Sequence, residues 1–186
     1  MALLVLGVLL WVAAHWLKRL APEFRAGLET RFGAGSKGVV AAVIGVSLVL
    51  MIVGYRSSDF IHVYATPFWT VHLNNLMMLF AVALMGAGKS KGRARALMRH
   101  PMLVGVIVWA VAHLMVNGDL ASVILFGGLG AWGVASIVMI NRAEPEWTRP
   151  EPGPLKGDIR LAAITVVLFI VITGVHALVG PSPFPG

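Results

Sequence analysis

The chain has 186 residues, of which 58% are hydrophobic and only 12% are charged, and its mean hydropathy is +0.85. Soluble domains carry about one quarter charged residues, so this composition excludes an ordinary soluble protein and indicates one that lies in a lipid bilayer. The chain contains no cysteine, which excludes disulfides and thiolate ligands. The net charge of +7 is expected to orient membrane helices, and no nucleic-acid partner is predicted.

Six apolar stretches, separated by charged or Gly- and Pro-rich breaks, predict an all-α, polytopic bundle of about six transmembrane helices. In chain order they are approximately Ala2–Leu17, Gly38–Tyr55, Pro67–Gly86, Pro101–Val116, Leu120–Ile140 and Arg160–Gly180. The first and fourth are short for a span, which needs about 20 residues, yet both are expected to cross. Residues 1–186 are expected to form a single transmembrane domain.

The distribution of basic residues predicts the orientation of these helices. With six crossings, fourteen of the fifteen Lys and Arg residues fall on one side, and Arg56 is the exception. The basic side of a membrane protein faces the cytoplasm, so both termini are expected on the periplasmic side of a bacterial inner membrane. The first stretch has no basic residues before its apolar run, so we expect a retained helix and not a signal peptide.

The first and fourth stretches resemble each other. Segments Leu6–Leu17 and Val104–Met115 are identical at five of twelve positions. In both, a Gly, a Trp and a His recur four residues apart, so they form one stripe along a helix face. The two stripes are Gly7, Trp11 and His15, and Gly105, Trp109 and His113. The two helices run in opposite directions, as in an inverted repeat of 3+3 helices. Chance similarity between two apolar helices is the alternative, since the other stretches show no such match.

Four histidines lie inside apolar stretches, namely His15, His72, His113 and His176. Ionisable side chains are costly in a membrane unless they face the protein interior, which makes these histidines functional candidates. Two imidazoles from different helices suit a bis-histidine haem b, whereas the alternative is that each only hydrogen-bonds a neighbouring helix. His113 is expected to pair with His15 or with His72, and depth along the helices favours His72. Asn74 and Asn75 are expected to pack helices.

Several motifs together resemble the NnrU family of bacterial membrane proteins. They are the run Arg99-His100-Pro101-Met102-Leu103-Val104-Gly105, then Trp109, Ala112-His113-Leu114 and Asn117-Gly118-Asp119-Leu120. The His15 helix with the basic loop after it, and the motif Pro67-x-Trp69-x-x-His72, resemble the family's other landmarks. The resemblance covers nearly the whole chain.

The resemblance implies a link to nitrite and nitric oxide metabolism (denitrification), through redox chemistry, sensing or enzyme maturation, with respiratory or denitrification membrane proteins as partners. The zeta-carotene isomerases are similar in this domain and carry haem b on two histidines. By that similarity His15 and His113 are the expected iron ligands. The other residues expected around the haem are Gly7, Trp11, His72, Gly105 and Trp109.

One position departs from the isomerase pattern. The isomerases have a cysteine three residues before the second histidine, where this chain has Ala110, which argues against their redox-linked chemistry. Whether the protein is an enzyme therefore stays open. The alternatives to a haem-dependent redox protein are an isomerase acting on a hydrophobic polyene, and a scaffold or transporter without cofactor.

Overall fold

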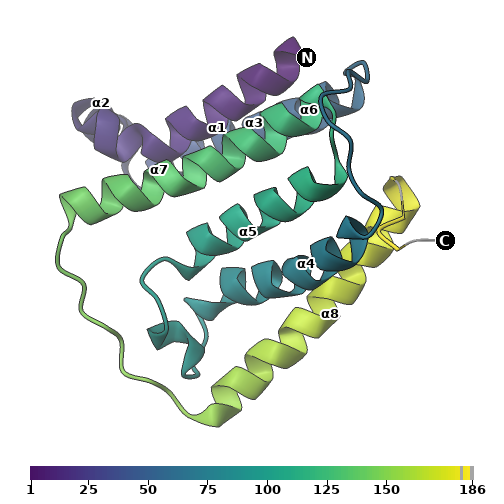
Figure 1. Cartoon of the computed structure of the whole chain (residues 1–186). Helices are drawn as coiled ribbons and strands as arrows, with labels where there is room; N and C mark the ends of the chain where they lie inside the picture. The colour runs from purple at the N-terminus through teal and green to yellow at the C-terminus, as the bar shows by residue number, and fades with distance from the viewer. Residues whose placement is uncertain (181, 185–186) are drawn as a thin grey trace. The chain divides into compact units, whose positions relative to one another are not determined.

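The computed structural model describes residues 1–180 and 182–184, and within them the chain forms helices and no β-strand (Figure 1). Five segments are long and apolar enough to cross a membrane, and the 16-residue helix α5 (Pro101–Val116) is a shorter apolar one. The five long segments are Ala2–Leu20, Pro22–Arg56, Thr70–Ala87, Leu120–Ala143 and Leu155–Val179. The prediction of an all-α, multi-pass membrane protein with about six spans is confirmed.

The chain divides into two compact units, which are described separately. Unit 1 comprises Met1–Val63 and Asp119–Gly128, and unit 2 comprises Tyr64–Gly118 and Leu129–Gly186. Unit 1 contains α1 (Ala2–Leu20), α2 (Pro22–Phe32), α3 (Ser36–Arg56), the single turn α6 (Leu120–Ser122) and the π-helical turn η3 (Val123–Gly127). Unit 2 contains α4 (Thr70–Ala87), α5, α8 (Leu155–Val179) and all of α7 (Gly128–Ala143) except its first residue.

Glycines allow α1 and α3 to pack closely in unit 1. A Cβ atom on Gly7 would lie 2.8 Å from Met51 N and 2.9 Å from Ser47 O, and one on Gly54 would overlap the backbone of Leu4. Leu4 itself is completely buried in this contact. Because lipid tails are as apolar as the side chains, such close backbone approach is a main source of helix association in membranes.

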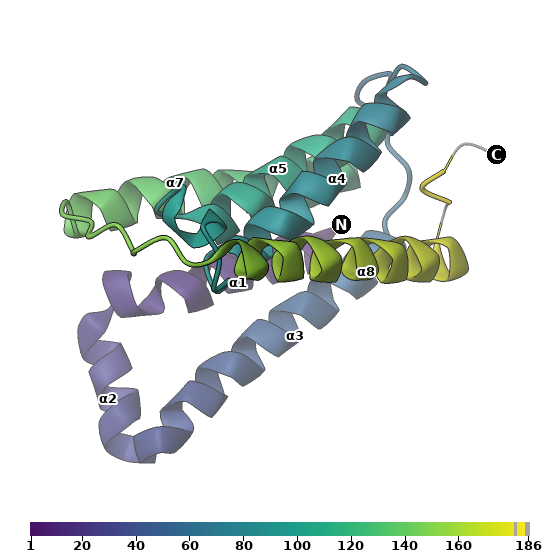
Figure 2. The ribbon, with the colours of Figure 1, turned by 90° about the horizontal axis from the view of Figure 1, so that it is seen from below.

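Helix α2 was not predicted, because the segment after the first span was expected to be a basic loop. It begins with Pro22 at its first turn, has Glu23 near its positive end, and carries an ion pair of 3.1 Å between Arg25 and Glu29. These are ordinary helix-start and helix-surface features. None of its residues is buried, and the turn after it contains Gly33 with φ of 53°, so α2 and α3 meet at an angle (Figure 2).

In unit 2, α4 packs against both α5 and α8. A Cβ atom on Gly105 would lie 2.9 Å from Ala81 O, so α5 approaches the α4 backbone as closely as α1 approaches α3. Glycines of α7 contact α5 in the same way, because a Cβ on Gly130 would lie 3.0 Å from the Cβ of Ala110. Ala110, which is only 1% exposed, therefore faces α7.

A turn at Asn117-Gly118-Asp119 connects α5 to α6. In unit 2, Tyr64 N donates to Gly118 O at 3.1 Å, and the Tyr64 hydroxyl donates to Asn117 O at 2.9 Å. In unit 1, Asp119 Oδ1 accepts from Ser122 N at 2.9 Å and so caps the helix that begins at Leu120. These bonds secure both sides of the turn.

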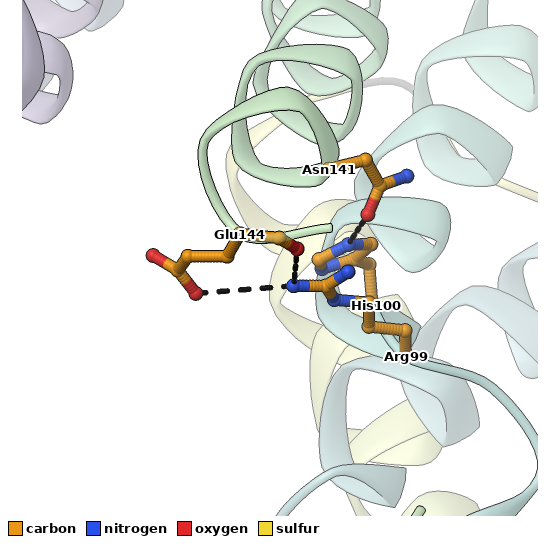
Figure 3. A network of polar contacts seen from close by, with 4 residues as sticks. All are labelled: Arg99, His100, Asn141 and Glu144. Atoms are coloured by element: carbon orange, nitrogen blue, oxygen red, sulfur yellow. Dashed lines mark hydrogen bonds and ion pairs between the residues drawn. The ribbon is translucent and has the colours of Figure 1, made fainter. Parts of the chain in front are cut away.

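A second set of polar contacts joins the basic connections of unit 2. Arg99 donates to Glu144 O at 2.6 Å, and His100 Nε2 donates to Asn141 Oδ1 at 2.9 Å (Figure 3). Arg149 also donates to Ala96 O at 2.6 Å. The Pro-rich segment after α7 is irregular, and these side chains hold it against the connection between α4 and α5.

Candidate functional site

His113 is oriented by its own helix. In α5, His113 Nδ1 lies 2.9 Å from Trp109 O, and a carbonyl oxygen only accepts, so Nδ1 carries the proton. The lone pair of this tautomer is then on Nε2, which is the arrangement usual for a metal-ligating imidazole. The ring centroids of Trp109 and His113 lie 5.2 Å apart, so the indole also restricts the imidazole.

His15 has the same local arrangement in α1. Its Nδ1 donates to Trp11 O at 2.8 Å, and the Trp11 and His15 ring centroids are 4.2 Å apart. The two Gly-Trp-His stripes thus agree in three respects: a glycine packed on a neighbouring backbone, a Trp carbonyl that accepts from the imidazole, and the same histidine tautomer. His15 is exposed, whereas His113 is half-buried.

The predicted pairing of His15 with His113 joins residues of different units, so it stays a prediction. Within the described part of the chain, no three or more His, Asp or Glu residues gather as a metal site. A haem held by two histidines does not need such a cluster. The donor chemistry of both residues fits that role, because each presents its lone pair on Nε2 and has a flat aromatic ring beside it.

Within unit 2, the neighbour of His113 is His176 on α8. Their ring centroids are 6.3 Å apart, and both residues line a cavity of about 220 Å³ between α4, α5 and α8. The cavity's other polar lining residues include Asn74, Asn75, Asn117 and Thr173. His72, which depth along the helix favoured as the partner of His113, is exposed, lies edge-on to Phe68 and does not line this cavity.

Asn74, one of the residues that line the cavity, has a buried oxygen without a hydrogen-bond donor. The residue is 8% exposed, and its Nδ2 donates to Asn75 Oδ1 at 3.0 Å. Its Oδ1 is buried and accepts no hydrogen bond from the described residues. A buried acceptor without a donor is costly, and native proteins rarely leave one. The sequence favoured a packing role for this residue, and only the fold reveals that its oxygen lacks a partner.

The remaining polar groups around the cavity are held by backbone atoms. Asn75 donates to Pro183 O at 2.9 Å, and Asn117 donates to His113 O at 2.8 Å. The Thr173 hydroxyl donates to Phe169 O at 2.9 Å, one turn earlier in α8. The polar wall is therefore largely fixed before a ligand arrives.

Charge and size restrict what this cavity accommodates. No Asp, Glu, Lys or Arg is present among its described lining residues, and Met78, Val82 and Phe169 contribute apolar wall. At about 220 Å³ it is smaller than the roughly 300–1,000 Å³ of sites for drug-sized ligands. The cavity alone is thus too small for a porphyrin or a long polyene.

Comparison with known proteins gives one match. The family described as NnrU protein matches residues 3–183, which is nearly the entire chain. Comparisons with curated proteins and with solved structures gave no match.

Proposed function

We propose, from the premise that this chain belongs to the NnrU family, that it is a haem b protein of the bacterial inner membrane with His15 and His113 as axial ligands. Its role would lie in nitrite and nitric oxide metabolism, through electron transfer, sensing or the maturation of respiratory enzymes. The observation that carries the proposal is the bond that each histidine donates from Nδ1 to the Trp carbonyl four residues earlier.

This bond supports ligation for a physical reason. His15 and His113 each donate Nδ1–H to a carbonyl of their own helix, so the basic lone pair of each is on Nε2, as is usual for a metal-ligating imidazole. The same choice in two helices of different units favours a shared role as ligands.

The other residues of the stripes have supporting roles. Gly7 and Gly105 let the ligand helices pack tightly on α3 and α4, which fixes each imidazole relative to its unit. Trp11 and Trp109 hold the ligand rings by aromatic contact. When bound, haem would supply one-electron chemistry, and ligation by both His15 and His113 would favour electron transfer over simple gas binding.

The direct test is an absorption spectrum of detergent-purified protein from haem-replete cells. We expect a Soret band that is lost in His113→Ala and strongly reduced in His15→Ala, because one ligand of the pair is removed in each. A colourless wild-type protein would contradict the proposal.

His72→Ala is the matched control, since it removes another exposed intramembrane imidazole, whose ring lies edge-on to Phe68. We expect this variant to retain the wild-type spectrum. Loss of the Soret band in His72→Ala with retention in His15→Ala would instead assign the second ligand to His72.

A further inference from the structure

We propose that the end of unit 2 formed by the connection between α4 and α5 and by the start of α8 binds an anionic phospholipid. The phosphate lies in a basic cluster, which consists of Lys89, Lys91, Lys156 and Arg160. The acyl chains lie along α8. The site uses no histidine, so this inference goes beyond the proposed function and does not depend on haem binding.

Glycines hold the connection after α4 against the start of α8 (Figure 2). A Cβ atom on Gly92 would overlap the backbone of Asp158, and one on Gly157 would overlap the backbone of Lys91 and Gly92. Asp158 Oδ1 also accepts from Ala94 N at 2.9 Å. The two segments are therefore in direct contact, although more than 60 residues separate them in the sequence.

This contact brings the four cations of the basic cluster to one place. All four are exposed, and none of them forms an ion pair with a described residue. Residues 88–100 and 151–160 contain seven basic residues and two acidic ones, Glu151 and Asp158. The surface is therefore strongly positive and complements an anion.

The charged side chains around the basic cluster are already engaged. The Asp158 carboxylate is bound by the backbone and has the charge of Arg93 nearby, so it is not the counter-charge of the cluster. Arg95 Nε donates to Glu151 O at 3.0 Å, and Arg149 Nε donates to Ala96 O at 2.6 Å. These two arginines fix the connections, whereas the cluster is left to meet an external anion.

The basic cluster lies at the depth of the lipid phosphates. α8 has 25 residues, so at about 1.5 Å per residue it is roughly 37 Å long and exceeds the roughly 30 Å of the hydrocarbon core. Its first, charged turn therefore reaches the headgroup layer. A Cβ on Gly86 would lie 2.9 Å from Leu161 Cδ1, so α4 ends at the same level, and Lys89 follows that end by two residues.

An apolar face of α8 continues from the basic cluster into the membrane. Leu155 and Ile159 are 54% and 62% exposed and lie one turn apart, directly beside Lys156 and Arg160. Thr165 is the one buried residue of this helix, so its long apolar surface is open to acyl chains. A soluble phosphate ion would leave this surface uncovered, whereas a phospholipid covers it and pairs with the cations.

The test measures lipid binding to the full chain by mass spectrometry of the intact protein released from detergent. We expect phosphatidylglycerol to bind more tightly than phosphatidylcholine with the same acyl chains. Each basic residue close to an anionic headgroup strengthens binding roughly fivefold. The double variant Lys156→Gln/Arg160→Gln should therefore weaken the first phosphatidylglycerol by about 25-fold. Lys89→Gln/Lys91→Gln should weaken it by a similar factor.

The matched control is Lys18→Gln/Lys37→Gln, which removes two exposed lysines at helix ends of unit 1. It changes the net charge equally and should keep the first phosphatidylglycerol as tight as in the wild type. All these side chains are exposed, so the variants should fold, and an unchanged thermal unfolding profile verifies this. His113→Ala should lose haem and keep the lipid, which separates failure of the haem proposal from failure of this one.

Four results would overturn the proposal. Equal loss in Lys18→Gln/Lys37→Gln would mean that the lipid follows net charge alone, and equal affinity for the two lipids would mean that no anion is recognised. Displacement of the lipid by millimolar inorganic phosphate would assign the cluster to a soluble anion. A dimer that carries no phosphatidylglycerol would assign the α8 face to a second copy of the chain.

Discussion

Asp119 secures the start of the helix that follows the turn at Gly118. Its Oδ1 accepts from Ser122 N at 2.9 Å, and its Oδ2 accepts from the Ser122 hydroxyl at 2.6 Å. Ser122 is fully buried, so both bonds lie in a region with little water. The carboxylate is therefore a structural group of unit 1.

We predict that Asp119→Ala lowers the free energy of unfolding by about 0.5–2 kcal/mol, because a helix cap is lost and the Ser122 hydroxyl loses its acceptor. Unfolding in mixed detergent and SDS, followed by circular dichroism, measures the change. Asp119→Asn is the control, since an asparagine also caps helices and should lose less stability. Equal losses in the two variants would show that the cap is unimportant.

The local geometry of the two Gly-Trp-His stripes could be predicted from the sequence better than their surroundings. The spacing of Gly7, Trp11 and His15 and its repetition at His113 are readable in the sequence, and both imidazoles have the same tautomer in the structure. His176 was only one intramembrane histidine among four. Its closeness to His113 follows from the packing of α8 beside α4 and α5, which helical periodicity does not determine.

Helix packing in unit 2 depends on Gly105. A Cβ atom there would lie 2.9 Å from Ala81 O and 2.9 Å from Met85 Cγ, so α4 and α5 cannot stay at their present separation with a larger residue. We predict that Gly105→Ala lowers the free energy of unfolding by roughly 1–3 kcal/mol, as overpacking of a tight contact does.

The same SDS titration measures this effect, with Gly174→Ala as the control. A Cβ on Gly174 of α8 would have no atom within 4 Å, so stability should stay the same or rise slightly through better helix propensity. A stability loss of similar size in both variants would mean that glycine is needed for the helices themselves and not for their contact.

The spans were predictable because each is a long apolar run with charged or Gly- and Pro-rich ends. α5 begins and ends at the predicted residues, Pro101 and Val116, because proline starts it and the Asn117 turn ends it. The predicted sixth helix began at Arg160, whereas α8 begins five residues earlier, at Leu155, and so includes Lys156 and Asp158. α2 was missed because its helix-forming features are not apolar, and apolarity was the criterion.

The distribution of charge over the chain makes a prediction about its orientation. The chain lacks cysteine, so one introduced cysteine reports its own side of the membrane without background. We expect Asp59→Cys, in the connection after Arg56, to react with an impermeant maleimide from the periplasm. Glu146→Cys, in the connection between α7 and α8, should react only once the inner membrane is opened.

Both positions are exposed, so access and not burial decides the result. Labelling of Glu146→Cys alone from the periplasm would reverse the orientation. Labelling of both variants from the periplasm would place residues 59 and 146 on the same side of the membrane. The chain would then cross the membrane an even number of times between them, and not the odd number that six spans require.

The inverted repeat stays a prediction, and the two glycines that correspond in its proposed halves contact different neighbouring spans. Gly7 contacts α3, the span that follows its own helix, whereas Gly105 contacts α4, the span that precedes its own. A repeat of three consecutive helices would pair each glycine with the following span. Sequence identity within one stripe reports the local geometry of a helix and not which neighbour that helix contacts.

The bond from each imidazole to a carbonyl of its own helix has a wider implication for membrane cofactor proteins. Many metal-binding histidines are steered by an acidic residue, and such a residue is expensive to keep in hydrocarbon. A helix that orients its own imidazole through a backbone carbonyl does not need an acidic side chain for this purpose. The proposed ligation makes the nine-residue pattern Gly-x-x-x-Trp-x-x-x-His a candidate for transfer onto a designed membrane peptide, whose haem binding would be followed by its colour.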